Sequence, residues 1–94
     1  MTPLRLQEIS GNGKKLYLKK PLILQIYQAK SGLLIAKEPN LSLHVFAYTH
    51  RLLIKEVNEQ VIMMWDEYVK ESLESLTLDA QHLREQLLLY LEEP

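Results

Sequence analysis

Apolar and polar residues alternate with a period of two over much of the first half of the chain, which is the pattern of β-strands with one buried face. In the strongest such segment, Leu22, Leu24 and Ile26 face one side and share it with no charged residue. We therefore predict strands that each contribute one face to a core. The alternating segments are 4–9, 15–18, 22–28, 33–37 and 41–48.

Turn-forming residues separate these segments. Ser10–Gly13 joins the first two, because Gly and Asn accept positive φ at low cost, so residues 4–18 form a predicted hairpin. Pro21 lacks the N–H that a strand ladder needs, and we expect it at a strand start or edge. Lys30–Gly32 and Glu38–Asn40 mark the remaining turns.

After residue 48 the period changes to that of a helix with one apolar stripe. Thr49 is a good N-cap, and we expect the helix to extend from His50 to about Lys70, with an ion pair between Asp66 and Lys70 one turn apart. The stripe consists of Leu53, Ile54, Val57, Val61, Met64, Trp65 and Tyr68.

A second helix is predicted over residues 77–93, after a linker at 71–76 whose Ser and Glu residues break the period. Thr77 is its expected cap, and Asp79 lies in the first turn, where the helix dipole favours an acid. We expect residues 92–94 to fray. The apolar residues of this helix are Ala80, Leu83, Leu87, Leu88, Tyr90 and Leu91.

Strands that precede helices indicate an α+β fold. We predict a mainly antiparallel sheet of four to five strands, packed on one long helix, plus a C-terminal helix. The 94 residues suffice for one core. We therefore expect a single domain over 1–94, made of an N-terminal hairpin (1–20), a core (21–70) and the C-terminal helix (77–93).

Composition narrows the function classes. The chain has no cysteine, which excludes a disulfide framework, a zinc–thiolate site and thiol catalysis. No apolar run reaches the length of a membrane span, and no secretory signal pattern opens the chain. The sequence therefore predicts a cytoplasmic protein without a membrane partner.

The charges are unevenly distributed. Residues 1–55 hold nine Lys or Arg against two acids, a net charge of +7, whereas residues 56–94 hold two bases against ten acids, a net charge of −8. Either the folded molecule presents two surfaces of opposite sign, or the two halves pair with one another inside one fold.

Catalytic constellations are missing from the sequence. His44, His50 and His82 lack the spacing of metal ligands, and we expect all three on the surface. The acidic residues of the long helix lie opposite its apolar stripe, so we interpret them as a solvent-exposed face and not as a pair of catalytic carboxylates. The glycines near Lys14 lack phosphate-loop spacing. The prediction is a non-enzymatic protein with no cofactor and no metal.

Two surfaces are candidates for binding. Lys14, Lys15, Tyr17 and Lys19 interleave basic groups with an aromatic ring, as nucleic-acid surfaces do, although lysines on an edge strand also prevent sheet-to-sheet pairing.

The second candidate is a protein interface on the helices, comprising Met63, Glu67 and Leu88. Met63 lies off the stripe of the first helix, and Leu88 belongs to a run of three leucines. Apolar groups in such places favour a protein partner or a homo-oligomer. A homo-oligomeric structural subunit is therefore a further alternative.

Residues 21–70 resemble the HicB-like antitoxins of HicA–HicB toxin–antitoxin systems. The resemblance rests on the strand Leu22–Gln28, the turn Ser31-Gly32, the run Leu34-x-Ala36-x-x-Pro39-x-Leu41, a further strand, and the Thr49-capped helix that ends near Asp66-Glu67-Tyr68.

This resemblance implies a sheet on one helix, related to a partial RNase H core but without that enzyme's catalytic acids. It also implies a protein that binds and masks a HicA-like toxin and assembles as a dimer or a higher oligomer. The acidic helices suit a small basic partner of this kind.

The sequence departs from the family pattern in three places. His50-Arg51-Leu52 replaces the early glutamates of the helix, and the Gly expected soon after Leu41 is absent. Residues 71–94 are too few for the promoter-binding module that many members carry, so we expect a stand-alone member without a DNA-binding domain.

Overall fold

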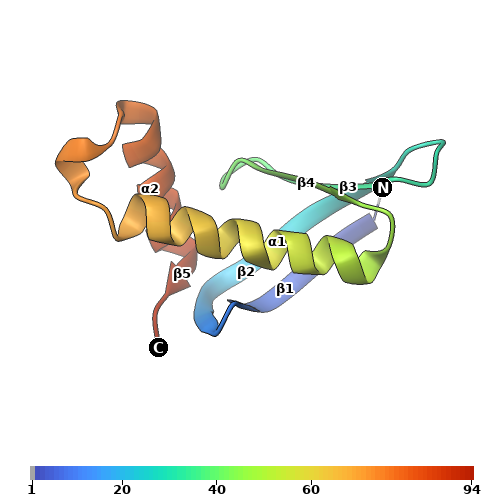
Figure 1. Cartoon of the computed structure of the whole chain (residues 1–94), viewed down its shortest axis with the longest axis horizontal. Helices are drawn as coiled ribbons and strands as arrows, with labels where there is room; N and C mark the ends of the chain where they lie inside the picture. Colours follow the sequence, from blue (N-terminus) through green and yellow to red (C-terminus); the bar gives the residue numbers. More distant parts are fainter. Residues whose placement is uncertain (1) are drawn as a thin grey trace.

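A computed structural model describes residues 2–94, with an antiparallel sheet that curves around one long helix (Figure 1). The strands are β1 (Thr2–Gly11), β2 (Lys14–Gln28), β3 (Leu34–Glu38) and β4 (Leu43–Ala47), hydrogen-bonded in that order, with the short β5 (Leu91–Glu92) added to β2. The helical segments are α1 (His50–Met64), the π-helix η1 (Trp65–Val69), the 3-10 turn η2 (Leu73–Ser75) and α2 (Leu78–Tyr90). The predicted α+β fold is confirmed.

β1 and β2 form one long hairpin around the two-residue turn Asn12-Gly13, whose φ angles of 52° and 76° match the turn type that suits twisted strands. The prediction of two separate strands on either side of Pro21 was wrong, because β2 continues through this residue. The register with β1 shifts at this point, so that Glu8 pairs with Tyr17 and Leu6 with Leu22. Pro21 lies in the irregular stretch between these pairs, where β1 requires no N–H from it.

The core lies between the inner face of the sheet and the stripe of α1. The predicted inward residues of β2 are buried, and Leu53, Val57 and Val61 of α1 are fully enclosed. In Figure 1, α1 runs in front of β1 and β2, and its contacts with the sheet are mainly to β1 and β4, the first and last strands of the sheet order. Because the described helices cover only this concave side, the other side of the sheet, called here the outer face, is exposed along β2, β3 and β4.

The first helix begins as predicted, since Leu52 N–H donates to Thr49 Oγ1 at 3.1 Å. It also ends near Lys70, as predicted, although its last turn widens to a π-helix that closes with Lys70 N–H donating to the Trp65 carbonyl oxygen at 3.2 Å. The predicted ion pair between Asp66 and Lys70 does not form. Asp66 instead pairs with Lys14 of β2, and Lys70 with Glu93 at 3.0 Å.

The end of the chain is held in place, contrary to the prediction that it frays. α2 begins at the Thr77 cap but ends at Tyr90, three residues before the predicted boundary. The backbone then extends as β5, in which Leu91 pairs with Leu18. Leu91 is fully buried, so the burial of this side chain stabilises the change from helix to strand.

The turn between β3 and β4 contains a strained residue. The buried carboxylate of Glu38 accepts hydrogen bonds from the N–H groups of Asn40 at 3.1 Å and Leu41 at 2.6 Å, which fixes the turn. Ser42 follows with a φ of 54°, in the left-handed region that favours glycine. This is where the sequence lacks the glycine of the HicB-like pattern.

We predict that Ser42→Gly raises the free energy of unfolding by about 0.5–1 kcal/mol, because the relief of left-handed strain outweighs the greater entropy of glycine in the unfolded chain. Urea unfolding followed by circular dichroism measures this difference. Asn12→Gly is the matched control, since Asn12 also has a positive φ but asparagine tolerates it, so its effect is expected to be smaller. A loss of stability in Ser42→Gly would contradict the strain.

Candidate binding surfaces

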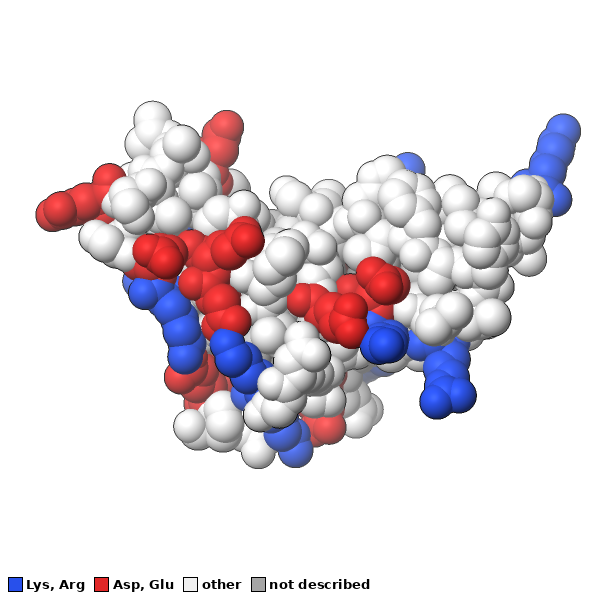
Figure 2. Space-filling model, in the orientation of Figure 1, with Lys and Arg blue, Asp and Glu red and all other residues white. Residues whose placement is uncertain are grey.

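The helical side of the molecule carries an acidic surface. Figure 2 views the side of α1, where acidic side chains lie along the helix and on the linker and α2 at the left. Few of them take part in the ion pairs of residues 2–94. This acidic helical surface is defined by the exposed carboxylates of the helical segments and their linker that have no ion pair in the described part of the chain: Glu56, Glu67, Glu71, Glu74, Asp79 and Glu85.

Two of the three predicted interface residues come together on this side. Met63 is 46% exposed and lines a hollow of about 490 Å³ with Glu67 and Glu59. Leu88 does not join them, because it is half-buried and packs against the core. The neighbouring Leu89 is the exposed leucine of that run. The periodicity of α2 alone does not decide between adjacent leucines of such a run.

Ile62, next to Met63 in the sequence, does not extend the exposed apolar surface. Ile62 is 4% exposed and packs against the β1–β2 turn. A Cβ added to Gly11 would lie 3.3 Å from Ile62 Cδ1, so glycine at this position lets the hairpin approach the helix. Met63 remains as the apolar centre of the hollow.

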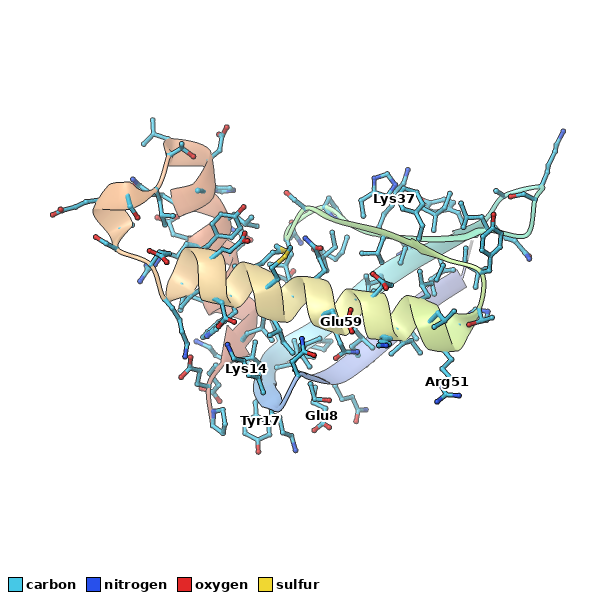
Figure 3. The ribbon with its side chains drawn as sticks, in the orientation of Figure 1. Glu8, Lys14, Tyr17, Lys37, Arg51 and Glu59 are labelled. Carbon is cyan, nitrogen blue, oxygen red and sulfur yellow. The ribbon has the colours of Figure 1, made fainter. Side chains whose placement is uncertain are left out.

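The lysines of the predicted nucleic-acid surface are divided between two sides of the hairpin. Lys14 lies toward α1, where it pairs with Asp66, whereas Tyr17 points away from the helix (Figure 3). Lys15 is 3.3 Å from Glu8 and 5.3 Å from the centre of the Tyr17 ring. Lys19 is exposed. The four residues therefore do not form one basic patch, and two of the three lysines already contact a carboxylate.

The outer face carries aromatic residues that the sequence predictions missed. Tyr27 and Phe46 lie in one row across the sheet, with Ile35 between them on β3. Gln25, Lys37 and His44 form the next row. Tyr27, His44 and Phe46 alternate with the buried Ile26, Leu43 and Val45, so the available signal was the presence of aromatic residues where a solvated strand usually carries polar ones.

Close contacts link the two rows of the outer face. The Lys37 ammonium lies 5.4 Å from the centre of the Tyr27 ring, and the centres of the His44 and Phe46 rings are 4.8 Å apart. A groove of about 540 Å³ opens beside them, lined by Gln25, Tyr27, Lys37, His44 and residues of the β3–β4 turn. In Figure 3, Lys37 lies on the side of β3 and β4 away from α1.

A polar cluster ties the chain end to the π-helix η1. The Trp65 indole N–H donates to Glu93 Oε1 at 2.7 Å, and Lys70 pairs with the same carboxylate oxygen. The hydrogen bond from Trp65, followed by that from Lys70, lowers the pKa of Glu93 below its ordinary value of 4.5. The reciprocal hydrogen bond and the negative charge of Glu93 raise the pKa of Lys70.

The described residues contain no gathering of three or more His, Asp or Glu side chains that could hold a metal ion. His44, His50 and His82 are exposed, as predicted. Within residues 2–94, no helix combines the length and apolar character needed to cross a membrane.

No family model, curated protein or solved structure matches this chain. The resemblance of residues 21–70 to HicB-like antitoxins therefore stays a prediction.

We predict that Glu93→Gln destabilises the protein at neutral pH and that this difference disappears in acid. Folding lowers the pKa of Glu93. The ionised Glu93 therefore stabilises the folded protein fully at pH values above its ordinary pKa of 4.5, and this stabilisation is lost as the pH falls through the lower pKa of the folded state. Urea unfolding at pH values from about 7 to 3, followed by the fluorescence of Trp65, the one tryptophan of the chain, measures it.

Glu92→Gln is the matched control, since Glu92 is exposed and has no ion pair in the described part of the chain. It is expected to follow the wild type at every pH. The proposed role of the Glu93 charge is incorrect if Glu93→Gln and the wild type differ equally at neutral and acidic pH.

Proposed function

We propose that this chain is a non-enzymatic binding protein whose acidic helical surface binds a small basic protein, as HicB-like antitoxins bind their toxins. The observation that carries the proposal is the group of exposed carboxylates without an ion pair along the helical segments and their linker, one of which, Glu67, lines the hollow beside Met63. Unpaired charge of one sign attracts a partner of the opposite sign and accelerates its association.

Apolar contact would supply the affinity that exposed charges do not. Exposed ion pairs contribute little free energy, whereas an apolar side chain that enters a partner's surface excludes water at the centre of an interface. Met63 suits this role, because it lies in a hollow whose wall includes the acids Glu59, Asp66 and Glu67 and one cation, Lys14, which pairs with Asp66. Acids outnumber the one lysine in this wall, so the hollow favours a basic partner over an acidic or uncharged one.

The course of the backbone supports the HicB-like form of this proposal. Residues 22–70 fold as three antiparallel strands followed by a Thr49-capped helix, in the order that the resemblance implies. Ser42 adopts a glycine-like backbone where the family pattern places a glycine. β1 occupies one edge of β2, and β5 pairs with β2 on the other edge, beyond the end of β3; the resemblance includes neither β1 nor β5.

We predict that Glu67→Lys weakens binding of the basic partner about tenfold and reduces the dependence of association on salt, because it places a cation where the partner is basic. The probe is the product of a small basic reading frame adjacent to the gene, and the absence of any such reading frame would itself contradict the proposal. Isothermal titration calorimetry of the two full-length chains at two salt concentrations measures the effect. Met63→Ala is expected to weaken binding at both concentrations, because it removes an apolar contact.

Two variants serve as controls. Glu8→Lys makes the same charge change on β1, and Leu52→Ala removes a side chain of similar exposure about 16 Å along the same helix. Both are expected to bind as the wild type does. Equal weakening by Glu8→Lys and Glu67→Lys, or no binding of the neighbouring gene product by the wild type, would contradict the proposal.

A further inference from the structure

We propose that the outer face of the sheet binds single-stranded nucleic acid, on the opposite side of the core from the acidic helical surface. The site would comprise Tyr27 and Phe46 as stacking platforms and Lys37 as the cation nearest to them. It is separate from the site of the proposed protein partner and from the hairpin lysines predicted from the sequence.

The two aromatic rings lie in a row that a strand of bases could follow. Phe46 is 51% exposed and Tyr27 41%, so each offers part of its ring to solvent. They are two strands apart, with Ile35 between them, which places them about 10 Å from one another at the usual strand spacing. Bases stack on exposed aromatic rings whatever their identity, so such a surface binds single strands with little sequence preference.

The charge of the outer face suits a phosphate backbone. Lys37 lies beside Tyr27, and Arg5 lies on β1 opposite the exposed Ile23 of β2. The one acid of β3 and β4 is Glu38, which is buried and bonded to the turn on the inner side. The rows from Arg5 to Phe46 therefore contain cations and no carboxylate.

The groove beside the aromatic rows adds polar groups that could contact base edges. Gln25, His44 and Ser42 line it together with Lys37 and Glu38, and its volume of about 540 Å³ lies in the range of small-molecule sites. Amide, imidazole and hydroxyl groups both donate and accept hydrogen bonds. Because the Glu38 carboxylate opposes a phosphate there, a nucleotide that stacks on Tyr27 would place its base in this groove and leave its phosphate outside.

A single strand is favoured over the other occupants of such a face. The bases of a duplex are already stacked on one another and present their edges, so exposed rings on a sheet gain little from them. A second copy packed face to face would bring Lys37 and Arg5 close to like charges, which opposes association. The separation of charge also orients a nucleic acid toward the sheet, because the acidic helical surface repels it.

Fluorescence anisotropy with labelled single strands of 12 nucleotides, one of thymidine and one of uridine, tests the proposal at low and moderate salt. The wild type is expected to bind at least one of them, and a 12-base-pair duplex about tenfold more weakly. Phe46→Ala and Tyr27→Ala are each expected to weaken binding about tenfold, and Lys37→Glu to weaken it and to lower the salt slope. All three side chains are exposed, so circular dichroism is expected to show an unchanged fold.

Lys55→Glu makes the same charge change on α1, where the lysine side chain is 66% exposed, and is expected to bind like the wild type. The proposal is overturned if neither strand binds at low salt, if the duplex binds as tightly, or if Lys55→Glu and Lys37→Glu lose binding equally. It is also overturned if sizing shows a dimer that Phe46→Ala converts to monomer while no nucleic acid binds, because the face then serves self-association.

Failure of this proposal is distinguishable from failure of the protein-binding proposal. Glu67→Lys is expected to leave the binding of single strands undiminished, and Phe46→Ala to leave the binding of the basic protein unchanged. A result in which each variant affects only its own ligand supports both sites.

Discussion

Burial of the α1 stripe against a single sheet is the constraint on which the rest of the structure depends. Leu53, Val57 and Val61 are fully enclosed by the inner side chains of the strands, which removes apolar surface from water at about 25 cal/mol per Å². One long helix covers one side of the sheet, so the other side stays uncovered along β2–β4. The aromatic residues of the outer face are exposed because no helix of the described residues packs on that side of the sheet.

The same core separates the charges. Strands supply most of the bases and helical segments most of the acids, although several basic side chains lie among the acids on the face that Figure 2 shows. Only a few pairs join the halves, among them Lys14 with Asp66. Further ion pairs between the bases of the strands and the acids of the helical segments would have to form across the core. Such pairs would lose side-chain entropy and would remove both charged groups from water.

Much of the fold could be predicted from the sequence because periodicity is a local property. The buried face of β2 and the cap of α1 each depend on residues close together in the sequence. Both were found as predicted, at Leu22, Leu24 and Ile26 for the strand and at Thr49 for the helix. The errors concern contacts between distant residues. Pro21 lies inside a strand because of a register shift, and Asp66 pairs with Lys14, 52 positions away, instead of Lys70.

The sequence by itself determined the order of the elements, the inner residues of each strand and the stripe of α1, because these follow from side-chain spacing. Tertiary structure alone decided that residues after Tyr90 form a strand and that Glu93 binds Trp65, since both need partners far along the chain. It likewise decided that Tyr27, Lys37 and Phe46 are neighbours. Strand register sets which outward residues meet, and spacing within one strand carries no information about it.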